Sequence, residues 1–70
     1  MEAITLVKII APFDFGNVRD QRAFASNADA YDWAARRIEY FNKKEDEETG
    51  EKGMWKHDAE FETVTFVEAD

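Results

Sequence analysis

Carboxylates are the side chains of this chain whose number and spacing are best suited to chemistry. Residues 1–44 hold six Asp and Glu against seven Lys and Arg, a net charge of +1. Residues 45–70 hold ten Asp and Glu against two Lys, a net of −8, and the two parts give the −7 of the whole chain. The negative charge therefore gathers in the last third, as a run with Glu45, Asp46, Glu47, Glu48 and Glu51 and an alternating row with Asp58, Glu60 and Glu62.

Two interpretations of these carboxylates stay open. Same-face neighbours on a strand lie about 7 Å apart, within a Debye length of roughly 8 Å, so their charges repel one another. Such charge commonly keeps a small protein soluble. It also suits docking on a basic protein surface, including a nucleic-acid-binding groove, in which case the protein would be a nucleic-acid mimic. The acidic run lacks the Asp-x-Asp-x-Asp-Gly spacing of a calcium-binding loop.

The sequence lacks the other groups of residues that commonly form metal, catalytic or phosphate-binding sites. The chain has no cysteine and one histidine, which excludes thiolate and His-rich metal sites. Asp58 follows His57, but neighbours along a strand point to opposite faces, and we expect His57 at the surface or at an edge. The single serine, Ser26, is explained by a helix cap, and the three glycines form no phosphate-binding loop. We therefore expect a protein that is not an enzyme and has neither cofactor nor metal.

Basic and aromatic residues lie between positions 33 and 44. Arg36-Arg37 and Lys43-Lys44 are offset by nearby acidic residues, which argues against direct nucleic-acid binding. Trp33 and Tyr40 fall on the flank of an expected helix, where they either widen its core face or form an aromatic contact patch for a partner. Arg37 follows Trp33 by one helical turn and is expected over its ring.

The elements that would position these groups begin with two strands. Ala3–Ala11 is rich in β-branched residues and stops before Pro12, which predicts a strand. Both of its faces are apolar, with Ile4, Leu6 and Ile10 on one side and Val7 and Ile9 on the other. Residues 12–17 predict a turn in which Gly16 and Asn17 adopt positive φ, and Val18–Ala25 predicts a weaker strand with Val18 and Phe24 on the same face.

A helix is the clearest predicted element. Ser26 is suited to cap the amide of Asp29, and apolar residues then follow at helical spacing, at Tyr31, Ala34, Ala35, Ile38 and Phe41. We expect the helix to end near Lys44, because the acidic run that follows would oppose the negative end of the helix dipole. Residues 45–53 then form an acidic loop. Alternation from Met54 to Val67 predicts a last strand, with a break near His57-Asp58.

These elements predict a single small α+β domain over residues 1–70. Its topology is ββαβ, with a three-stranded sheet in the order 2-1-3 and the helix packed on one face. The other face has no second helix. The sequence leaves three ways to cover this face: by Phe13 and Phe15, by a partner, or by a second copy of the chain. The second copy would belong to a homodimer that forms through this open face or through an edge strand.

Length and charge narrow the class of function. No apolar run approaches the roughly 18 residues of a membrane span, and the N-terminus lacks the basic region of a signal peptide, so we expect a cytoplasmic protein. In size and charge the chain resembles the small acidic proteins that phages encode to block host enzymes, which implies an inhibitor or modulator. The leading hypothesis is a non-enzymatic binding module whose acidic residues, with Trp33 and Tyr40, dock on a basic partner protein. The alternative is a structural protein that assembles as a homodimer.

Overall fold

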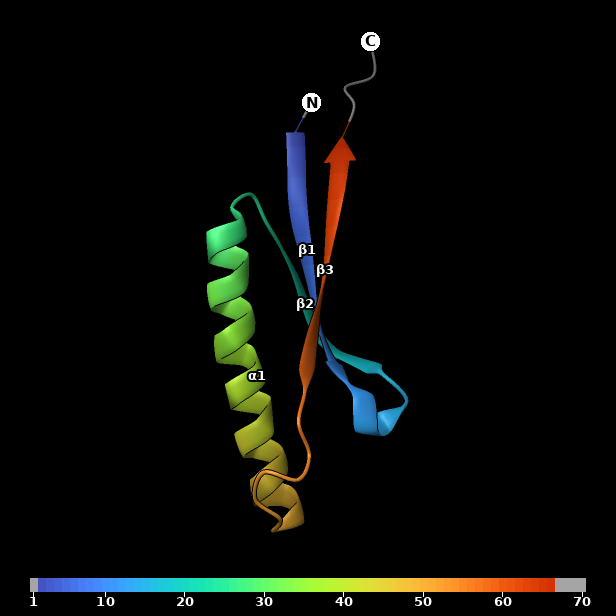
Figure 1. The fold of residues 1–70 in the computed structure, drawn as a ribbon, viewed down its shortest axis with the longest axis vertical. Helices are drawn as coiled ribbons and strands as arrows, with labels where there is room; N and C mark the ends of the chain where they lie inside the picture. Colours follow the sequence, from blue (N-terminus) through green and yellow to red (C-terminus); the bar gives the residue numbers. More distant parts are fainter. Residues whose placement is uncertain (1, 67–70) are drawn as a thin grey trace.

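The computed structural model describes residues 2–66, and the side chains of residues 3–65. It contains three strands and one long helix: β1 (Glu2–Ala11), β2 (Asn17–Phe24), α1 (Asn27–Thr49) and β3 (Asp58–Phe66), with a short 3-10 turn, η1 (Pro12–Asp14), after β1. The strand order is β2-β1-β3, and β1 pairs antiparallel with both neighbours (Figure 1). The predicted α+β fold, its ββαβ order and the central place of β1 are confirmed.

The two faces of β1 have different surroundings. Thr5, Val7, Ile9 and Ala11 are buried on the side that α1 covers. The alternate residues Ile4, Leu6, Lys8 and Ile10 are only half-buried, because no second helix within residues 2–66 covers their side of the sheet. The fold therefore has two layers, and one sheet face stays open among the described residues.

The core between α1 and the sheet is small. Val7 and Ile9 are its largest fully buried side chains, and burial of each contributes about 1.5–3 kcal/mol. Ala30 and Ala34 bring the helix backbone close to β1, and larger side chains close the sides of the core: Phe24, Trp33, Ile38, Phe41 and Ala59. Of the predicted stripe, Ala34, Ile38 and Phe41 pack in this core. Tyr31 and Ala35, which were placed in it, are exposed, because Ala30 takes the central position.

The turn after β1 differs from the prediction in detail. Positive φ occurs at Phe15 (57°) and Gly16 (73°) rather than at Gly16 and Asn17. The Phe15 side chain is 99% exposed, and Phe13 turns onto Trp55 and His57 instead. Phe15 therefore does not cover the open sheet face. Phe13 packs against Trp55 and His57, which lie in the segment that leads into β3.

A bulge in β2 changes which residues share a face. Ile9 pairs with Asp20 while Ile10 pairs with Val18, so Arg19 is the extra residue. The prediction that Val18 and Phe24 share a face is wrong for this reason. Val18 joins Ile10 on the open face, and Phe24 lies under α1, where it packs against the helix.

The helix begins as predicted and ends later than predicted. The Ser26 hydroxyl accepts a hydrogen bond from the amide of Asp29 at 3.5 Å, which confirms the N-cap. The C-terminal end lies at Thr49, not near Lys44, because specific caps offset the unfavourable charge. The Thr49 hydroxyl donates to the Glu45 carbonyl at 2.8 Å, and Gly50, at φ 74°, donates its N–H to the Asp46 carbonyl at 2.9 Å. The first half of the predicted acidic loop 45–53 is thus helical.

The last strand is shorter at its start than the alternating pattern indicated. β3 begins at Asp58, so the predicted break near His57-Asp58 is the boundary of the strand, and residues 54–57 approach it without pairing. Val67, which the pattern also placed in the strand, lies outside the described residues. Over the part of the chain that is described, no helix is long and apolar enough to cross a membrane.

Candidate functional site

The open sheet face gathers the alternating carboxylates with apolar residues. Cross-strand partners share a face, and β3 pairs with β1 as Val64 with Ile4, Glu62 with Leu6, Glu60 with Lys8 and Asp58 with Ile10. On the other side of β1, the partners are Ala23, Gln21 and Val18. We define the open sheet face by these residues of the three strands: Ile4, Leu6, Lys8, Ile10, Val18, Gln21, Ala23, Asp58, Glu60, Glu62 and Val64.

The charge of the open sheet face is negative. Asp58, Glu60 and Glu62 are exposed along β3, and Lys8 is half-buried directly opposite Glu60. Oppositely charged cross-strand neighbours stabilise a sheet by about 0.2–1 kcal/mol, so Lys8 offsets part of the repulsion within the row. Three carboxylates against one ammonium group leave this face with a formal charge of −2. The carboxylates of this face thus lie in a row along β3, next to the apolar residues of β1.

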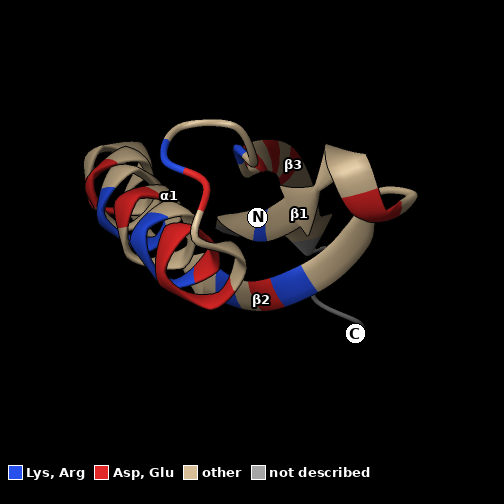
Figure 2. Cartoon of the chain, turned by 90° about the horizontal axis from the view of Figure 1, so that it is seen from below, with Lys and Arg blue, Asp and Glu red and all other residues tan. Residues whose placement is uncertain are grey.

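The second acidic group occupies the end of α1. Glu45, Asp46, Glu47 and Glu48 lie in the last helical turns, and Glu51 follows the Gly50 cap. In Figure 2 the red of this group is seen at the near end of the helix, and the red bands of β3 are seen apart from it, on the sheet. Since α1 covers the face opposite to the row, the structure does not join all the predicted acidic residues into one surface.

The two aromatic candidates differ in exposure. Trp33 packs on Phe24, with ring centroids 5.5 Å apart, and it belongs to the side of the core. Tyr40 is half-exposed two helical turns further along the same side of α1, next to Phe41. The packing of Trp33 matches the interpretation that it widens the core face, whereas half of Tyr40 remains open to contact by a partner.

Arg37 is placed differently from the prediction. Its guanidinium lies over Tyr40 and Phe41, at 4.8 and 5.1 Å from the ring centroids, rather than over Trp33. The reason is Asp20 on β2, whose Oδ2 accepts hydrogen bonds from Arg37 Nε at 3.0 Å and Nη2 at 2.8 Å. This ion pair draws the side chain towards the sheet and ties α1 to β2.

His57 is buried, which corrects its predicted place at the surface or an edge. Its side chain is 6% exposed, between Phe13 and Phe41, whose ring centroids lie 5.1 and 5.4 Å from the imidazole. Asn42 Oδ1 accepts the backbone N–H of His57 at 2.7 Å and lies 2.9 Å from its Nδ1. Because that oxygen is an acceptor, the Nδ1 atom is the donor, and Nε2 carries the lone pair of the neutral ring.

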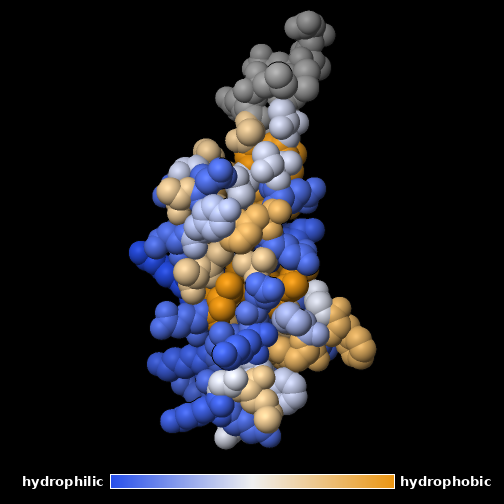
Figure 3. Space-filling model, viewed as in Figure 1, coloured by the Kyte–Doolittle hydropathy of each residue, from blue (hydrophilic) through white to orange (hydrophobic). Residues whose placement is uncertain are grey.

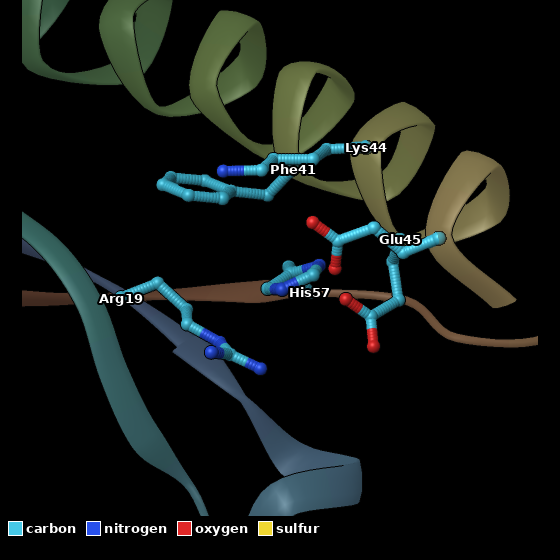
Figure 4. A pocket seen from close by; sticks show the side chains of 6 residues that line it. Arg19, Phe41, Lys44, Glu45 and His57 are labelled. Carbon is cyan, nitrogen blue, oxygen red and sulfur yellow. The ribbon is translucent and has the colours of Figure 1, made fainter.

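A cleft lies beside His57, between the end of α1 and β2. It has a volume of about 120 Å³ and is lined by Arg19, Phe41, Lys44, Glu45, Glu48 and His57 (Figure 4). Burial and the Arg19 guanidinium lower the pKa of His57, and the Glu45 carboxylate opposes them. The lining residues include no hydroxyl or thiol, so this cleft holds no Ser–His or Cys–His pair.

One exposed aromatic pair was not predicted from the sequence. Tyr31 on α1 and Phe61 on β3 stack with ring centroids 4.6 Å apart, and they remain 60% and 40% exposed. The alternation of β3 does place Phe61 on the face opposite to Glu60 and Glu62, which was the available signal. Its partner could not be found from the sequence, because Tyr31 was assigned to the core stripe of the helix.

Comparison with protein-family models, curated proteins and solved structures found no match to this chain. Among the described residues, no group of three or more His, Asp or Glu side chains is arranged to hold a metal ion. The functional argument therefore rests on the surfaces of the molecule itself.

Proposed function

We propose that this protein is a non-enzymatic binding module that docks a basic partner protein on its open sheet face, and modulates that partner by occupying its surface. The observation that carries the proposal is the register between β1 and β3. It puts the exposed carboxylates of Asp58, Glu60 and Glu62 directly beside half-buried Ile4, Leu6 and Ile10.

The make-up of this face supports a protein partner. Specific interfaces combine an apolar centre with a polar rim, and complementary charge across them raises association rates and selects partners. The open sheet face offers both, since β1 supplies the apolar residues and β3 the carboxylates. The fold also favours a partner there. A chain of this size with no cysteine depends on its hydrophobic core, and among the described side chains the large, fully buried ones are Val7 and Ile9.

The charge favours a basic partner over a second copy. A face-to-face homodimer would bring two faces of formal charge −2 together, with six carboxylates against two Lys8 side chains. Like charges at an interface oppose association. Assembly through the open sheet face nevertheless stays the second candidate, since Ile4, Leu6 and Val64 would be covered in it. Sedimentation of a single species of monomer mass at high concentration would reject the dimer.

The test compares charge reversals on the two acidic surfaces. The immobilised protein is used to capture partners from a lysate of its source cells, at low and at high salt. Glu60→Lys/Glu62→Lys should abolish capture of a basic protein, and Glu47→Lys/Glu48→Lys, with the same change of charge at the end of α1, should retain it. Salt should weaken the wild-type interaction, because charge pairs near a surface are screened.

The opposite pattern would contradict the proposal. If the helix variant loses the partner and the sheet variant keeps it, the acidic helix end is the binding surface. If both variants capture the same proteins as the wild type, the carboxylates act in solubility alone. Circular dichroism of both variants controls for folding.

A further inference from the structure

The outer edge of β3 is the most accessible strand edge in the described part of the molecule. β3 pairs with β1 on one side only, in an unbroken register from Glu2 with Phe66 to Ile10 with Asp58. An edge strand presents a row of backbone N–H and C=O groups that can pair with another strand. β3 is also the nearest strand in Figure 1, with β1 and β2 behind it and α1 to one side.

The other edge of the sheet is protected. β2 carries a bulge at Arg19, which breaks the regular spacing of its backbone groups. The Asp20–Arg37 ion pair also joins β2 to the helix. Bulges, inward-pointing charges and charged side chains along the strand are among the devices by which proteins limit edge pairing. The described residues of β3 form no bulge, and its exposed carboxylates oppose pairing with an acidic strand but not with a basic one.

The two sides of β3 differ in chemistry along this edge. On the open side, its exposed residues are Asp58, Glu60 and Glu62. On the helix side, Phe61 stacks on Tyr31, and both rings remain exposed. In the space-filling view, patches of hydrophobic colour lie along the middle of the molecule among hydrophilic residues, and another lies at the lower right (Figure 3).

We infer that β3 recruits an extended segment of the basic partner as a fourth strand, in which Lys or Arg alternates with apolar residues. The inference rests on the proposed function and specifies how the partner binds. In an added strand, side chains alternate between the faces. One set lies beside Glu60 and Glu62 and must be basic, and the other set extends the Tyr31–Phe61 stack and must be apolar or aromatic.

A second copy of this chain fits the edge poorly. Pairing of β3 with β3 of another copy would place two rows of carboxylates side by side, where like charges are destabilising. Parallel pairing with β2 of another copy would set Gln21 and Ala23, which carry no charge, on the side of the Glu60 and Glu62 carboxylates, and antiparallel pairing would set Asp20 there beside Arg22. The charge of the edge therefore selects a different, basic chain.

The probe is a fluorescein-labelled peptide of alternating Lys and Val, as long as β3. Two control peptides have the same composition: one has its Lys and Val in separate blocks, and the other has alternate backbone amides methylated. Fluorescence anisotropy should give a dissociation constant at least about tenfold lower for the alternating peptide than for either control. Hydrogen exchange should slow at the β3 amides and remain unchanged at those of β2.

Variants of the protein locate the interaction. Glu60→Lys/Glu62→Lys should abolish binding of the alternating peptide, and Glu47→Lys/Glu48→Lys, matched in charge, should leave the affinity within about twofold. Tyr31→Ala should weaken binding several-fold without unfolding the protein, because Tyr31 is 60% exposed.

Three results would overturn the inference: equal binding of all three peptides, protection at β2 instead of β3, or no binding of the alternating peptide. The first would show that the carboxylates attract basic chains by charge without strand pairing, so the proposed function would stand while the fourth strand would not. Loss of the partner by the helix variant in the capture experiment would reject the proposed function itself.

Discussion

At the scale of single residues, Asp20 is a polar group that joins the two layers. Its Oδ2 accepts two hydrogen bonds from Arg37, and its Oδ1 accepts the backbone N–H of Gln21 at 2.8 Å. The Asp20–Arg37 side chains are about one-third exposed, at 31% and 34%, whereas the Asp32–Arg36 pair within α1 is 62% and 77% exposed. Only the first pair is sheltered from solvent and spans two elements.

We expect Asp20→Ala to lower the free energy of unfolding by about 1–3 kcal/mol, since hydrogen bonds to charged groups are among the stronger ones. Asp32→Ala removes one exposed ion pair of the same composition and should cost less than about 0.5 kcal/mol. Urea denaturation of the two variants measures the difference. Equal costs would show that the link between α1 and β2 adds nothing to stability.

His57 makes the stability depend on pH. Burial and Arg19 lower its pKa in the folded protein below the ordinary 6.5, against the opposing effect of Glu45. Between these two pKa values the unfolded chain binds a proton that the folded protein does not, so the free energy of unfolding falls as pH drops below about 6.5 and levels off beneath the folded pKa.

NMR titration of the His57 ring measures that pKa directly, and urea denaturation between pH 7.5 and 5.5 measures its effect. His57→Gln should show a shallower loss of stability over this range, because it removes the titrating group and keeps polar atoms for Asn42. A His57 ring that titrates at or above 6.5 would contradict the burial that we describe.

At the scale of elements, the sequence was sufficient for the existence and order of the strands and for the start of the helix. β-branched residues and Pro12 define β1, and Ser26 with Asp29 defines the N-terminus of α1, because these signals are local. The end of α1 was missed, since the charge pattern was weighed against the helix dipole while the caps from Thr49 and Gly50 were not. The β2 bulge was missed because no local signal marks Arg19.

The candidate site was predictable to a similar extent. The alternation of Asp58, Glu60 and Glu62 fixed their common face, and the two apolar sides of β1 indicated an open sheet face. The sequence could not separate this row from the acids at the end of α1, because the separation arises only from which face the helix covers. The burial of His57 could not be predicted from the sequence either, since its partners Phe13, Phe41 and Asn42 are distant in sequence.

Matched substitutions on the two faces of β1 test directly whether the sheet face opposite to α1 is uncovered. Ile9 is fully buried and its neighbour Ile10 is only half-buried, so the same substitution should have different costs. Ile9→Val should lower the free energy of unfolding by about 0.5–1.5 kcal/mol. Ile10→Val should cost less than about 0.5 kcal/mol, since less apolar area is lost from a covered site. Equal costs at all protein concentrations would mean that the second face is covered within the chain itself.

At the scale of the whole molecule, the elongated two-layer shape keeps its acidic surfaces apart. The Cα extents are 54 × 23 × 12 Å, with the helix end and the β3 row on different layers. A partner that docks on the open sheet face would convert two layers into three and cover the apolar residues of β1. The same partner could leave the acidic helix end in solvent, where its charge contributes to solubility.

The absence of cysteine from the sequence permits a direct measurement of where the partner sits. Glu60→Cys and Glu47→Cys, each labelled with benzophenone maleimide, are irradiated in the same lysate. We predict that the label on the open sheet face forms a covalent adduct with a basic protein, that excess unlabelled wild type suppresses the adduct, and that the label at position 47 forms none with that protein. An adduct formed from position 47 and not from position 60 would contradict the central claim that the open sheet face is the binding surface.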